Sequence, residues 1–247
     1  ITNNTALRIL NIPFCSLSTI DVSNNINLEY VDVSHNYLTS LDFSNHAALI
    51  TLECGNPMID IEPLNSIHTL NLSGAPNLLH LDTAFMPSVN NIDFSTIPLL
   101  EFFHGRYCGF TELDFSNNPD LTFLYIGGVE NGLISGFSNN LSELDLSNNP
   151  NLEEIDVRYT NISSLNLKNG NNEMLNIMWA DTNDALFCIQ VDDGTAANNG
   201  DAPYNNWIVD PQISYSENCV LGIAENELEN FSMYPNPASQ QIQIDVP

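Results

Sequence analysis

The chain has 247 residues and carries 31 acidic against 4 basic side chains, which gives a formal charge of −27 at pH 7. A protein of this charge repels phosphate groups, so the composition excludes nucleic acid as a partner. No apolar run approaches the roughly 20 residues of a membrane-spanning helix, so we expect no membrane span. The five cysteines are an odd number, so at least one has no partner within the chain.

An internal repeat occupies most of the chain. A phrase of the form L-x-x-L-x-L-x-x-N recurs, with substitutions, at steps of mostly 10 or 11 residues. Positions 4 to 6 of the phrase alternate apolar and polar, as a half-buried strand does, and two adjacent phrases make one coil of 21 residues. The copies begin at Leu7, Leu17, Leu28, Leu38, Leu49, Ile67, Leu78, Val89, Leu100, Phe110, Leu121, Leu141, Leu152, Ile162 and Met174, and more faintly at Leu186.

This repeat predicts a solenoid. One coil cannot bury its own apolar face, so positions 1, 4 and 6 must fill a core shared with the neighbouring coils. Stacked strands about 4.8 Å apart would form parallel ladders, and Asn at position 9 would bond free backbone groups where the chain turns. We therefore expect a mostly β fold of about eight 21-residue coils, with two parallel β-sheets and little helix.

The two halves of each coil differ at the outward positions 3, 5 and 7. Half A is small, polar and monotonous, which indicates a solvated structural surface that we call face A. Its triplets are Thr19-Asp21-Ser23, Ser40-Asp42-Ser44, Thr69-Asn71-Ser73, Asn91-Asp93-Ser95, Glu112-Asp114-Ser116, Glu143-Asp145-Ser147 and Ser164-Asn166-Lys168. Half B is varied and contains aromatic residues; we call its surface face B. Its triplets are Ile9-Asn11-Pro13, Tyr30-Asp32-Ser34, Thr51-Glu53-Gly55, His80-Asp82-Ala84, Phe102-His104-Arg106, Phe123-Tyr125-Gly127, Glu154-Asp156-Arg158 and Asn176-Met178-Ala180.

Face B is the candidate recognition surface, because exposed aromatic and arginine side chains are typical of interaction hot spots. Two insertions, at about residues 55–66 and 127–140, both follow a B phrase and should leave the solenoid beside face B. The candidate ligand-binding residues are Tyr30, His80, Phe102, His104, Arg106, Phe123, Tyr125 and Arg158. The alternative is that these aromatic residues only pack against one another or against the inserted loops.

Metal binding and catalysis have weaker support in the sequence. Glu53, Asp82 and His104 follow one another in column 5 of face B, and such side chains can ligate a divalent ion such as Ca²⁺. No phosphate loop, zinc signature or nucleophile elbow occurs in the sequence. We therefore expect neither an enzyme nor a resident cofactor.

The repeats resemble those of leucine-rich repeat proteins. The nested 10/11 spacing with the wording LDxSNN is similar to the 21-residue repeats of secreted Bacteroidetes proteins and, more distantly, to those of the internalins. The resemblance covers about residues 5–193, so we assign residues 1–193 to the solenoid. It implies a binding module that is secreted or displayed on the cell surface.

Residues 194–219 resemble the cap that closes such repeat arrays, with a buried Trp207 and a closing cysteine. This resemblance suggests a disulfide bond between Cys188 and Cys219 in an oxidising exterior. We expect the other three cysteines, Cys15, Cys54 and Cys108, to be buried structural thiols.

Residues 220–230 are expected to form an acidic linker. Residues 231–247, with Tyr-Pro-Asn-Pro-Ala at 234–238, resemble the truncated start of the C-terminal sorting domain of the type IX secretion system. That resemblance implies export by a signal peptide and the type IX system. The plainer alternative is a chance proline-rich turn.

Three functional hypotheses remain open at this point. The first is an extracellular module that binds a protein or glycan through face B and its edge loops, for instance in adhesion. The second is a passive structural or adhesive spacer, in one version stabilised by cations. The third is a non-catalytic accessory region of a larger enzyme. The ligand and the oligomeric state are not indicated by the sequence.

Overall fold

The computed structural model describes residues 1–56, 64–89, 91–128 and 139–219, together with two short strands near the C-terminus. The chain divides into two compact units, Ile1–Glu217 and Asn218–Pro247. The first unit holds both the repeats and the cap, so residues 1–193 and 194–217 are not separate compact bodies. The expected linker, 220–230, lies outside the described residues, as do most of the two insertions.

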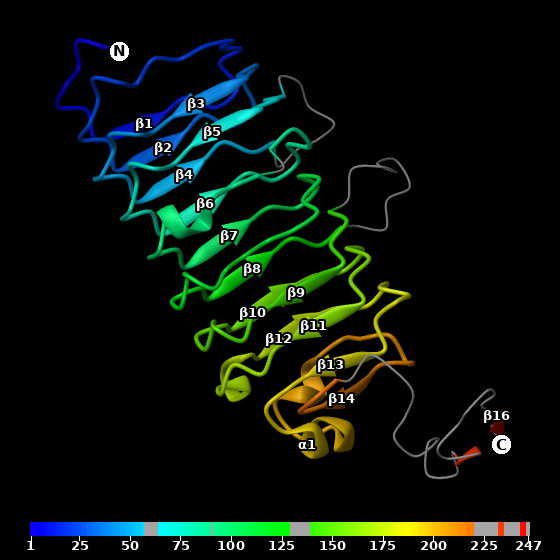
Figure 1. Ribbon diagram of the computed structural model, residues 1–247. Coiled ribbons are helices and arrows are strands. Elements are labelled where there is room, and N and C mark those ends of the chain that lie inside the picture. Colours follow the sequence, from blue (N-terminus) through cyan, green and yellow to red (C-terminus); the bar gives the residue numbers. More distant parts are fainter. Residues whose placement is uncertain (57–63, 90, 129–138, 220–231, 235–242, 246–247) are drawn as a thin grey trace. The chain divides into compact units, whose positions relative to one another are not determined.

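The first unit is a parallel β-solenoid (Figure 1), as the repeat predicted. Half B forms an eight-stranded sheet without interruption, in the order β1-β2-β4-β6-β7-β8-β10-β12. The central residue of each strand points inward and is buried, as in Val31, Leu52 and Leu81. The strands are Ile9–Asn11 (β1), Tyr30–Asp32 (β2), Thr51–Glu53 (β4), His80–Asp82 (β6), Phe102–His104 (β7), Phe123–Tyr125 (β8), Glu154–Asp156 (β10) and Ile177–Trp179 (β12).

Half A differs from the expectation of a second continuous sheet. It forms two separate pieces, one of two strands and one of four, in the orders β3-β5 and β14-β13-β11-β9. Residues 19–21, 91–93 and 112–114 are not strands, although their repeat phrases predicted strands there. The strands of this half are Ser40–Asp42 (β3), Thr69–Asn71 (β5), Glu143–Asp145 (β9), Ser164–Asn166 (β11), Cys188–Gln190 (β13) and Ser214–Ser216 (β14).

The central gap in half A coincides with a core that is filled by phenylalanine rings. Phe94 lies 4.6 Å from Phe115 and 4.9 Å from Phe103, measured between ring centroids. Phe94 also lies in a short 3₁₀ turn, Phe94–Thr96 (η1), that replaces the extended backbone just after residues 91–93. We attribute the break to these rings, which occupy more core volume than the leucines of later coils.

Buried asparagines at position 9 join each coil to its neighbour. The side-chain amide of Asn36 donates to the carbonyl oxygens of Ile12 and Val33, both at 3.0 Å, and its Oδ1 accepts from the backbone N–H of Leu17 at 2.9 Å. Asn65 and Asn139, which follow the two insertions, bond the backbone in the same way. The repeat therefore resumes with an asparagine bridge after each insertion.

The two halves turn in different ways. In half A the carboxylate of Asp145 accepts from the backbone N–H of Ser147 at 2.8 Å, and Asp42 does the same for Ser44 at 2.9 Å. In half B the residue at position 8 has a positive φ, between 49° and 62°, at Phe14, His35, Phe85, Tyr107, Tyr159 and Thr182. Two pairs of these rings stack between coils, with centroid distances of 4.2 and 5.0 Å.

These turns explain part of the difference in sequence between half A and half B. The Asp-x-Ser of half A is a local capping motif that holds the strand end. The aromatic residues at position 8 of half B serve a left-handed corner and pack there, and so do not belong to the candidate recognition surface. The same cap occurs in half B where position 5 is aspartate, because Asp32, Asp82 and Asp156 each accept from the backbone N–H two residues later. The contrast between the halves therefore lies in the left-handed corner at position 8 and in the aromatic residues of column 3.

The cap contains the only α-helix of the described residues, Gly194–Asn199 (α1), so the helix content is low as expected. Two 3₁₀ turns, Asn172–Met174 (η2) and Tyr204–Asn206 (η3), lie before and after it. Trp207 is buried, and its indole N–H donates to the carbonyl oxygen of Leu175 at 2.9 Å. These features agree with the capping role that the sequence suggested.

The cysteines follow the expectation with one exception. Cys188 and Cys219 are both disulfide-bonded, and the other three cysteines are free, so the two bonded residues pair with each other. Cys54 and Cys108 are buried, and burial raises the pKa of the Cys108 thiol to about 12. Cys15 is exposed, which corrects the prediction that it is buried. Its Sγ lies 3.3 Å from the carbonyl oxygen of Pro13.

In the second unit, Ser232–Tyr234 (β15) pairs antiparallel with Gln243–Asp245 (β16). This hairpin does not test the resemblance to a sorting domain. Among the described residues, no helix has the length and apolar character needed to cross a membrane.

The asparagine bridges predict a specific loss of stability. The buried Asn149 donates to the carbonyl oxygens of Phe115 at 3.0 Å and Asn118 at 2.7 Å. Because Asn149→Ala leaves both carbonyls buried without this donor, we expect the free energy of unfolding to fall by about 2 kcal/mol. The control Asn151→Ala removes an exposed amide of the same loop and should cost less than about 0.5 kcal/mol in urea unfolding. Equal losses for the two variants would contradict the role given to the buried amide.

Candidate functional site

The candidate site is the outward surface of the eight-stranded sheet, which is face B. The ladder places His80, Phe102 and Phe123 side by side in column 3, on β6, β7 and β8. The same register places Asp82, His104 and Tyr125 side by side in column 5. An aromatic row therefore runs beside a polar row along the axis of the solenoid.

The aromatic row is a stacked cluster, and its members are partly rather than fully exposed. The rings of His80 and Phe102 lie parallel with centroids 4.1 Å apart, and Phe102 lies 5.6 Å from Tyr125 and 6.2 Å from Phe123. Tyr30 is not part of this cluster, because Thr51 on β4 separates it from His80. Of the predicted binding residues, the structure thus brings together five: His80, Phe102, His104, Phe123 and Tyr125.

Two tyrosines of this face are held as hydrogen-bond donors. Burial, aided by the charge of Glu53, raises the pKa of the Tyr30 hydroxyl to about 12, and this hydroxyl donates to Glu53 at 3.3 Å. Burial and the neighbouring Glu154 raise the pKa of Tyr125 to about 12 as well. Both side chains are therefore neutral phenols at physiological pH.

The predicted metal ligands do not assemble into a metal site. Nδ1 of His104 lies 3.0 Å from Oδ2 of Asp82, so these two form a pair, whereas Glu53 accepts the bond from Tyr30. Among the described residues, no group of three or more His, Cys, Asp or Glu side chains is arranged to hold a metal ion. Adjacent strands align these three residues, but Asp82 pairs with His104, and Glu53 bonds to Tyr30 instead.

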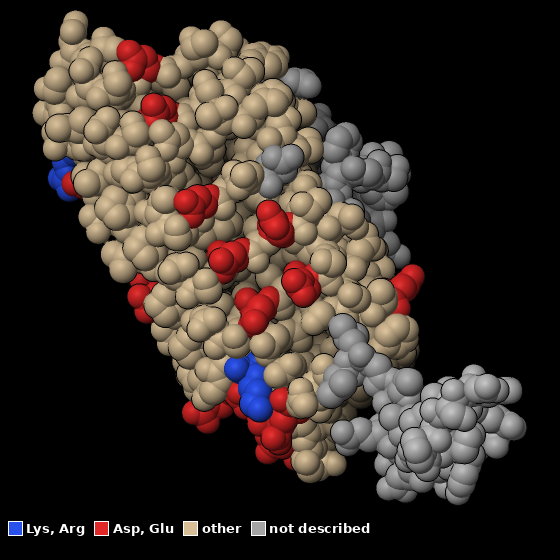
Figure 2. Space-filling view, viewed as in Figure 1, with Lys and Arg blue, Asp and Glu red and all other residues tan. Residues whose placement is uncertain are grey.

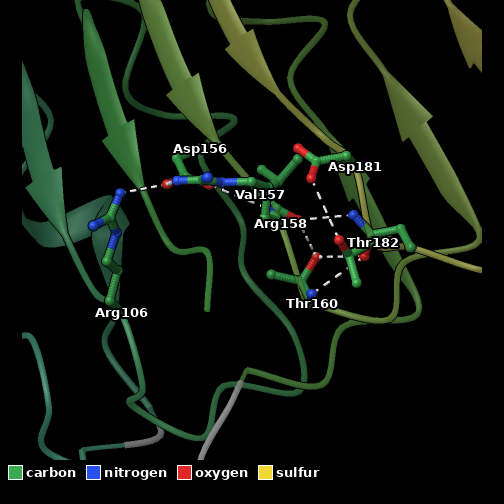
Figure 3. A network of polar contacts seen from close by, with 8 residues as sticks. Arg106, Asp156, Val157, Arg158, Thr160, Asp181 and Thr182 are labelled. Carbon is green, nitrogen blue, oxygen red and sulfur yellow. Dashed lines mark hydrogen bonds and ion pairs between the residues drawn. The ribbon is translucent and has the colours of Figure 1, made fainter. Parts of the chain in front are cut away.

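Arg106 and Arg158 converge on one buried carboxylate (Figure 3). Asp156 has no exposed side-chain surface, and it pairs with the guanidinium groups of both arginines. The Arg158 contacts are 3.0 Å from Nε to Oδ1 and 2.8 Å from Nη2 to Oδ2. The arginines are 24% and 31% exposed, so much of each guanidinium is committed to Asp156. This corrects the prediction that both charges are available to a ligand.

A glycine makes this convergence possible. Column 7 reads Arg106, Gly127, Arg158 on three successive coils, with Asp156 beside them in column 5. A Cβ atom at Gly127 would lie 2.4 Å from Oδ1 of Asp156, which is not tolerated. The missing side chain leaves room for the carboxylate, and Arg106 reaches across that coil. The column of two arginines around one glycine is visible in the sequence. The pairing of both arginines with Asp156 is not, because it depends on the space that Gly127 leaves.

One aromatic residue of the site escaped the sequence analysis. The last B phrase begins at Leu175, not at Met174, because β12 pairs Ile155 with Met178 and Asp156 with Trp179. Met178 is therefore buried, and Ile177 and Trp179 point outward. The guanidinium of Arg158 lies 5.4 Å from the Trp179 ring centroid, and that of Arg106 lies 5.6 Å from Tyr125. A phrase that begins at Leu175 has Met178 and Ala180 at the inward positions 4 and 6, and this apolar pair is the sequence signal for the correct register.

The comparisons with known proteins concern the fold. No protein-family model and no curated protein matches the sequence. Among solved structures, an internalin (inlF) from Listeria monocytogenes aligns with a TM-score of 0.53 and 16% sequence identity. The alignment covers 86% of this chain but 63% of that internalin, less than two thirds of its length. The functional domain of InlJ from Listeria monocytogenes, which includes a cysteine ladder, aligns with 18% identity over 84% of this chain and 64% of that one. Its TM-score of 0.29 is too low to carry an argument. The chain thus has an internalin-like leucine-rich repeat fold, and at these identities the likeness extends no further than the fold.

The buried ion cluster predicts a large effect of one neutral substitution. Asp156→Asn keeps the shape but leaves the two arginines without their shared counter-charge, so unfolding should become easier by about 3 kcal/mol. Asp145→Asn is the matched control, because Asp145 holds the same repeat position on face A and is exposed. Urea titration of the control should show a change below about 0.5 kcal/mol. A similar loss in both variants would show that the cluster has no special role.

His80 predicts a pH dependence of stability. Burial lowers the pKa of its imidazole below the ordinary value of 6.5. As the pH falls below that value, the unfolded chain therefore binds a proton at this residue before the folded chain does, and stability is lost. The His80→Phe variant keeps a ring against Phe102 and lacks this titration. The free energy of unfolding of the parent should fall between about pH 7.5 and about pH 5.5 by more than that of the variant, as measured by urea titration of both proteins at both pH values. A difference that is constant with pH would contradict this assignment.

Proposed function

We propose that this protein is a non-catalytic recognition module that binds a macromolecular partner through face B. The single observation that carries this proposal is the aromatic cluster around Phe102, which lies partly exposed on an unbroken eight-stranded sheet. Partly exposed rings on a rigid platform can bury further area against a partner at little cost in conformational entropy. The internalin-like fold makes a protein our preferred partner, with a glycan as the other possibility that the test includes.

The roles within the site follow from the geometry. Phe102, Phe123 and Tyr125 supply the contact area, with Trp179 added at the end of the sheet. The Tyr30 and Tyr125 hydroxyls, whose hydrogens are directed to Glu53 and Glu154, offer oxygen atoms that can accept hydrogen bonds from the partner. Arg106 and Arg158 contribute their planar faces over Tyr125 and Trp179, and they brace the surface through Asp156. Each arginine therefore acts first as a support of the face.

The proposal includes a location outside the cell. The resemblance of the tail to a type IX sorting domain, together with the disulfide bond formed by Cys188 and Cys219, supports secretion or display on the outer surface. Export by a signal peptide and the type IX system forms part of this proposal. A role in adhesion would follow from that location if the partner lies on another cell.

A passive spacer is the second candidate function, and one observation favours it. The rings of face B stack on one another, and all four basic side chains of the solenoid have contacts within the chain. A spacer needs no ligand, so its surface side chains would be expected to contact one another in this way. A non-catalytic region of a larger enzyme would have the same appearance, and the same experiment addresses it.

Binding can be tested with variants that borrow residues from the repeat itself. Thr51 occupies column 3 of β4, so Phe102→Thr and Phe123→Thr should preserve the fold. The parent and this double variant are screened against a glycan array and a panel of cell-surface proteins, with calcium and with a chelator. We expect the parent to bind one ligand and the variant to lose about tenfold or more in affinity, because two contact rings are removed.

The matched control changes an exposed column at the N-terminal end of the other face. Asp21→Asn and Asp42→Asn copy the native Asn71 of face A and should leave binding unchanged. If the control loses binding and the Phe102/Phe123 double variant keeps it, the binding surface is face A and not face B. No binding by the parent to any ligand, with or without calcium, would favour the spacer.

A further inference from the structure

A hollow on face A, away from the proposed recognition surface, has features of a second binding site. It lies where the ladder of half A is broken between β5 and β9, and it has a volume of about 1160 Å³. Its lining extends from residues 91–95 across β9 and β11 to Gln190 of β13. Five successive coils contribute to it, which corresponds to a length of about 19 Å at the usual spacing of strands.

The floor of the hollow is partly apolar. Ile92 and Leu113 are at the inward position 4, yet each is only partly buried, whereas Leu144 at the same position of β9 is 2% exposed. These two side chains leave apolar surface accessible at the floor of the hollow. Such surface gains free energy when a partner covers it.

The rim of the hollow is acidic. Figure 2 shows acidic side chains gathered over the middle of this face, around β9 and the half-coils before it. Five carboxylates line the hollow, and among the described residues that line it none is Lys, Arg or His; the five are Asp93, Glu112, Asp114, Glu143 and Asp145. The Ser116 hydroxyl and backbone N–H hold the pKa of Asp114 below its ordinary value, so this rim is charged at neutral pH. A cationic partner group would therefore be attracted to the part of the hollow between Asp93 and Asp145.

The chain itself cannot supply that cation. It has four basic residues, and the structure gives each of them another contact: Arg8 with Glu29, Arg106 and Arg158 with Asp156, and Lys168 with the backbone of Glu217. Residues 218–247 contain no Lys or Arg. A second copy would bring a charge of −27 and would be repelled. These 247 residues therefore do not supply the occupant.

The chemistry of the lining selects among cationic occupants. The five carboxylates are spread over three half-coils, and no group of three His, Cys, Asp or Glu side chains in the described residues is arranged for a metal ion. Phe94 is the single aromatic residue of the lining and is buried, so a sugar would find no exposed ring on which to stack. An extended peptide rises about 3.3 Å per residue, so about six residues would span the hollow. Alternate side chains of such a peptide would face the rim.

We propose that the hollow of face A binds an extended segment of a partner protein that presents Lys or Arg side chains on one edge. The carboxylates of the rim pair with these cations, and the aliphatic stems cover Ile92 and Leu113. The site is independent of face B, so the chain would hold one partner through two faces or two partners at once.

Peptide binding tests this proposal with the intact chain. The probe is the peptide Thr-Lys-Thr-Lys-Thr-Lys, and its fully Lys-acetylated form is the uncharged comparison of the same length. Calorimetry at physiological salt should give an affinity for the charged peptide at least about tenfold higher than for the acetylated one.

Two triple variants locate the site. Asp93→Asn/Asp114→Asn/Asp145→Asn removes three of the five rim charges, and the native Asn71 and Asn166 show that asparagine serves the same turn in this column. Glu101→Gln/Glu173→Gln/Asp184→Asn removes three exposed charges elsewhere, so both variants carry −27 + 3 = −24. We expect the rim variant to lose about tenfold in affinity and the other to stay within about twofold of the parent.

Three results would overturn the proposal. Equal losses in the two variants would show that net charge alone attracts the peptide. Equal affinities for the charged and acetylated peptides would exclude recognition of cations, and no measurable binding by the parent would exclude the site. None of these results depends on face B, so the proposed function is tested separately.

Discussion

The buried asparagine side chains at position 9 are the interaction on which the rest of the structure depends. Asn36 bonds backbone groups of its own coil and of the coil before it, and Asn118 and Asn149 bond carbonyl oxygens of the preceding coil. These bonds satisfy backbone groups that would otherwise be buried without partners at the corners that carry asparagine. They fix the height of each coil, and the inward leucines then stack in register. The insertions are tolerated because Asn65 and Asn139 restore the same bonds after them.

The difference between the two faces follows from this frame. In half A the Asp-x-Ser turn holds the strand end, and Asn71 and Asn166 donate to the aspartates of neighbouring coils, which relieves the repulsion within the acidic column. In half B the corner is made by a left-handed residue, and rings such as Phe85 and Tyr107 pack along it. The same cap recurs in column 5 of half B at Asp32, Asp82 and Asp156, and the outward columns of this half also carry the aromatic rings and the ion cluster around Asp156. A rigid scaffold thus presents a surface on which the aromatic residues of column 3 vary from coil to coil.

Much of the fold could be predicted from the sequence, because the length of the repeat and the position of a residue within it determine which side chains point inward. The phrase starts, the inward leucines and the bridging role of Asn36 and Asn149 all follow from a repeat of 10 or 11 residues. The register error at Met174 came from a longer spacer before the last B phrase, where Met and Ala replace leucine at the inward positions. The break in half A was not predictable from single phrases, since it depends on how Phe94, Phe103 and Phe115 share the core of neighbouring coils. The site was predicted by its columns but not by its contacts: the arginines that seemed free by position meet at Asp156, which lies in the same coil as Arg158 and two strands away from β7, the strand that precedes Arg106.

The central claim is that one scaffold carries a continuous sheet on face B and an interrupted, open surface on face A. Hydrogen–deuterium exchange of the free chain tests this most directly, because backbone amides in a ladder exchange slowly and unpaired ones exchange quickly. The account predicts strong protection through β4, β6, β7, β8 and β10, together with fast exchange in residues 91–93 and 112–114. Equal protection of both faces across these coils would show that half A forms a closed sheet, and it would contradict both the hollow and the distinction between the faces.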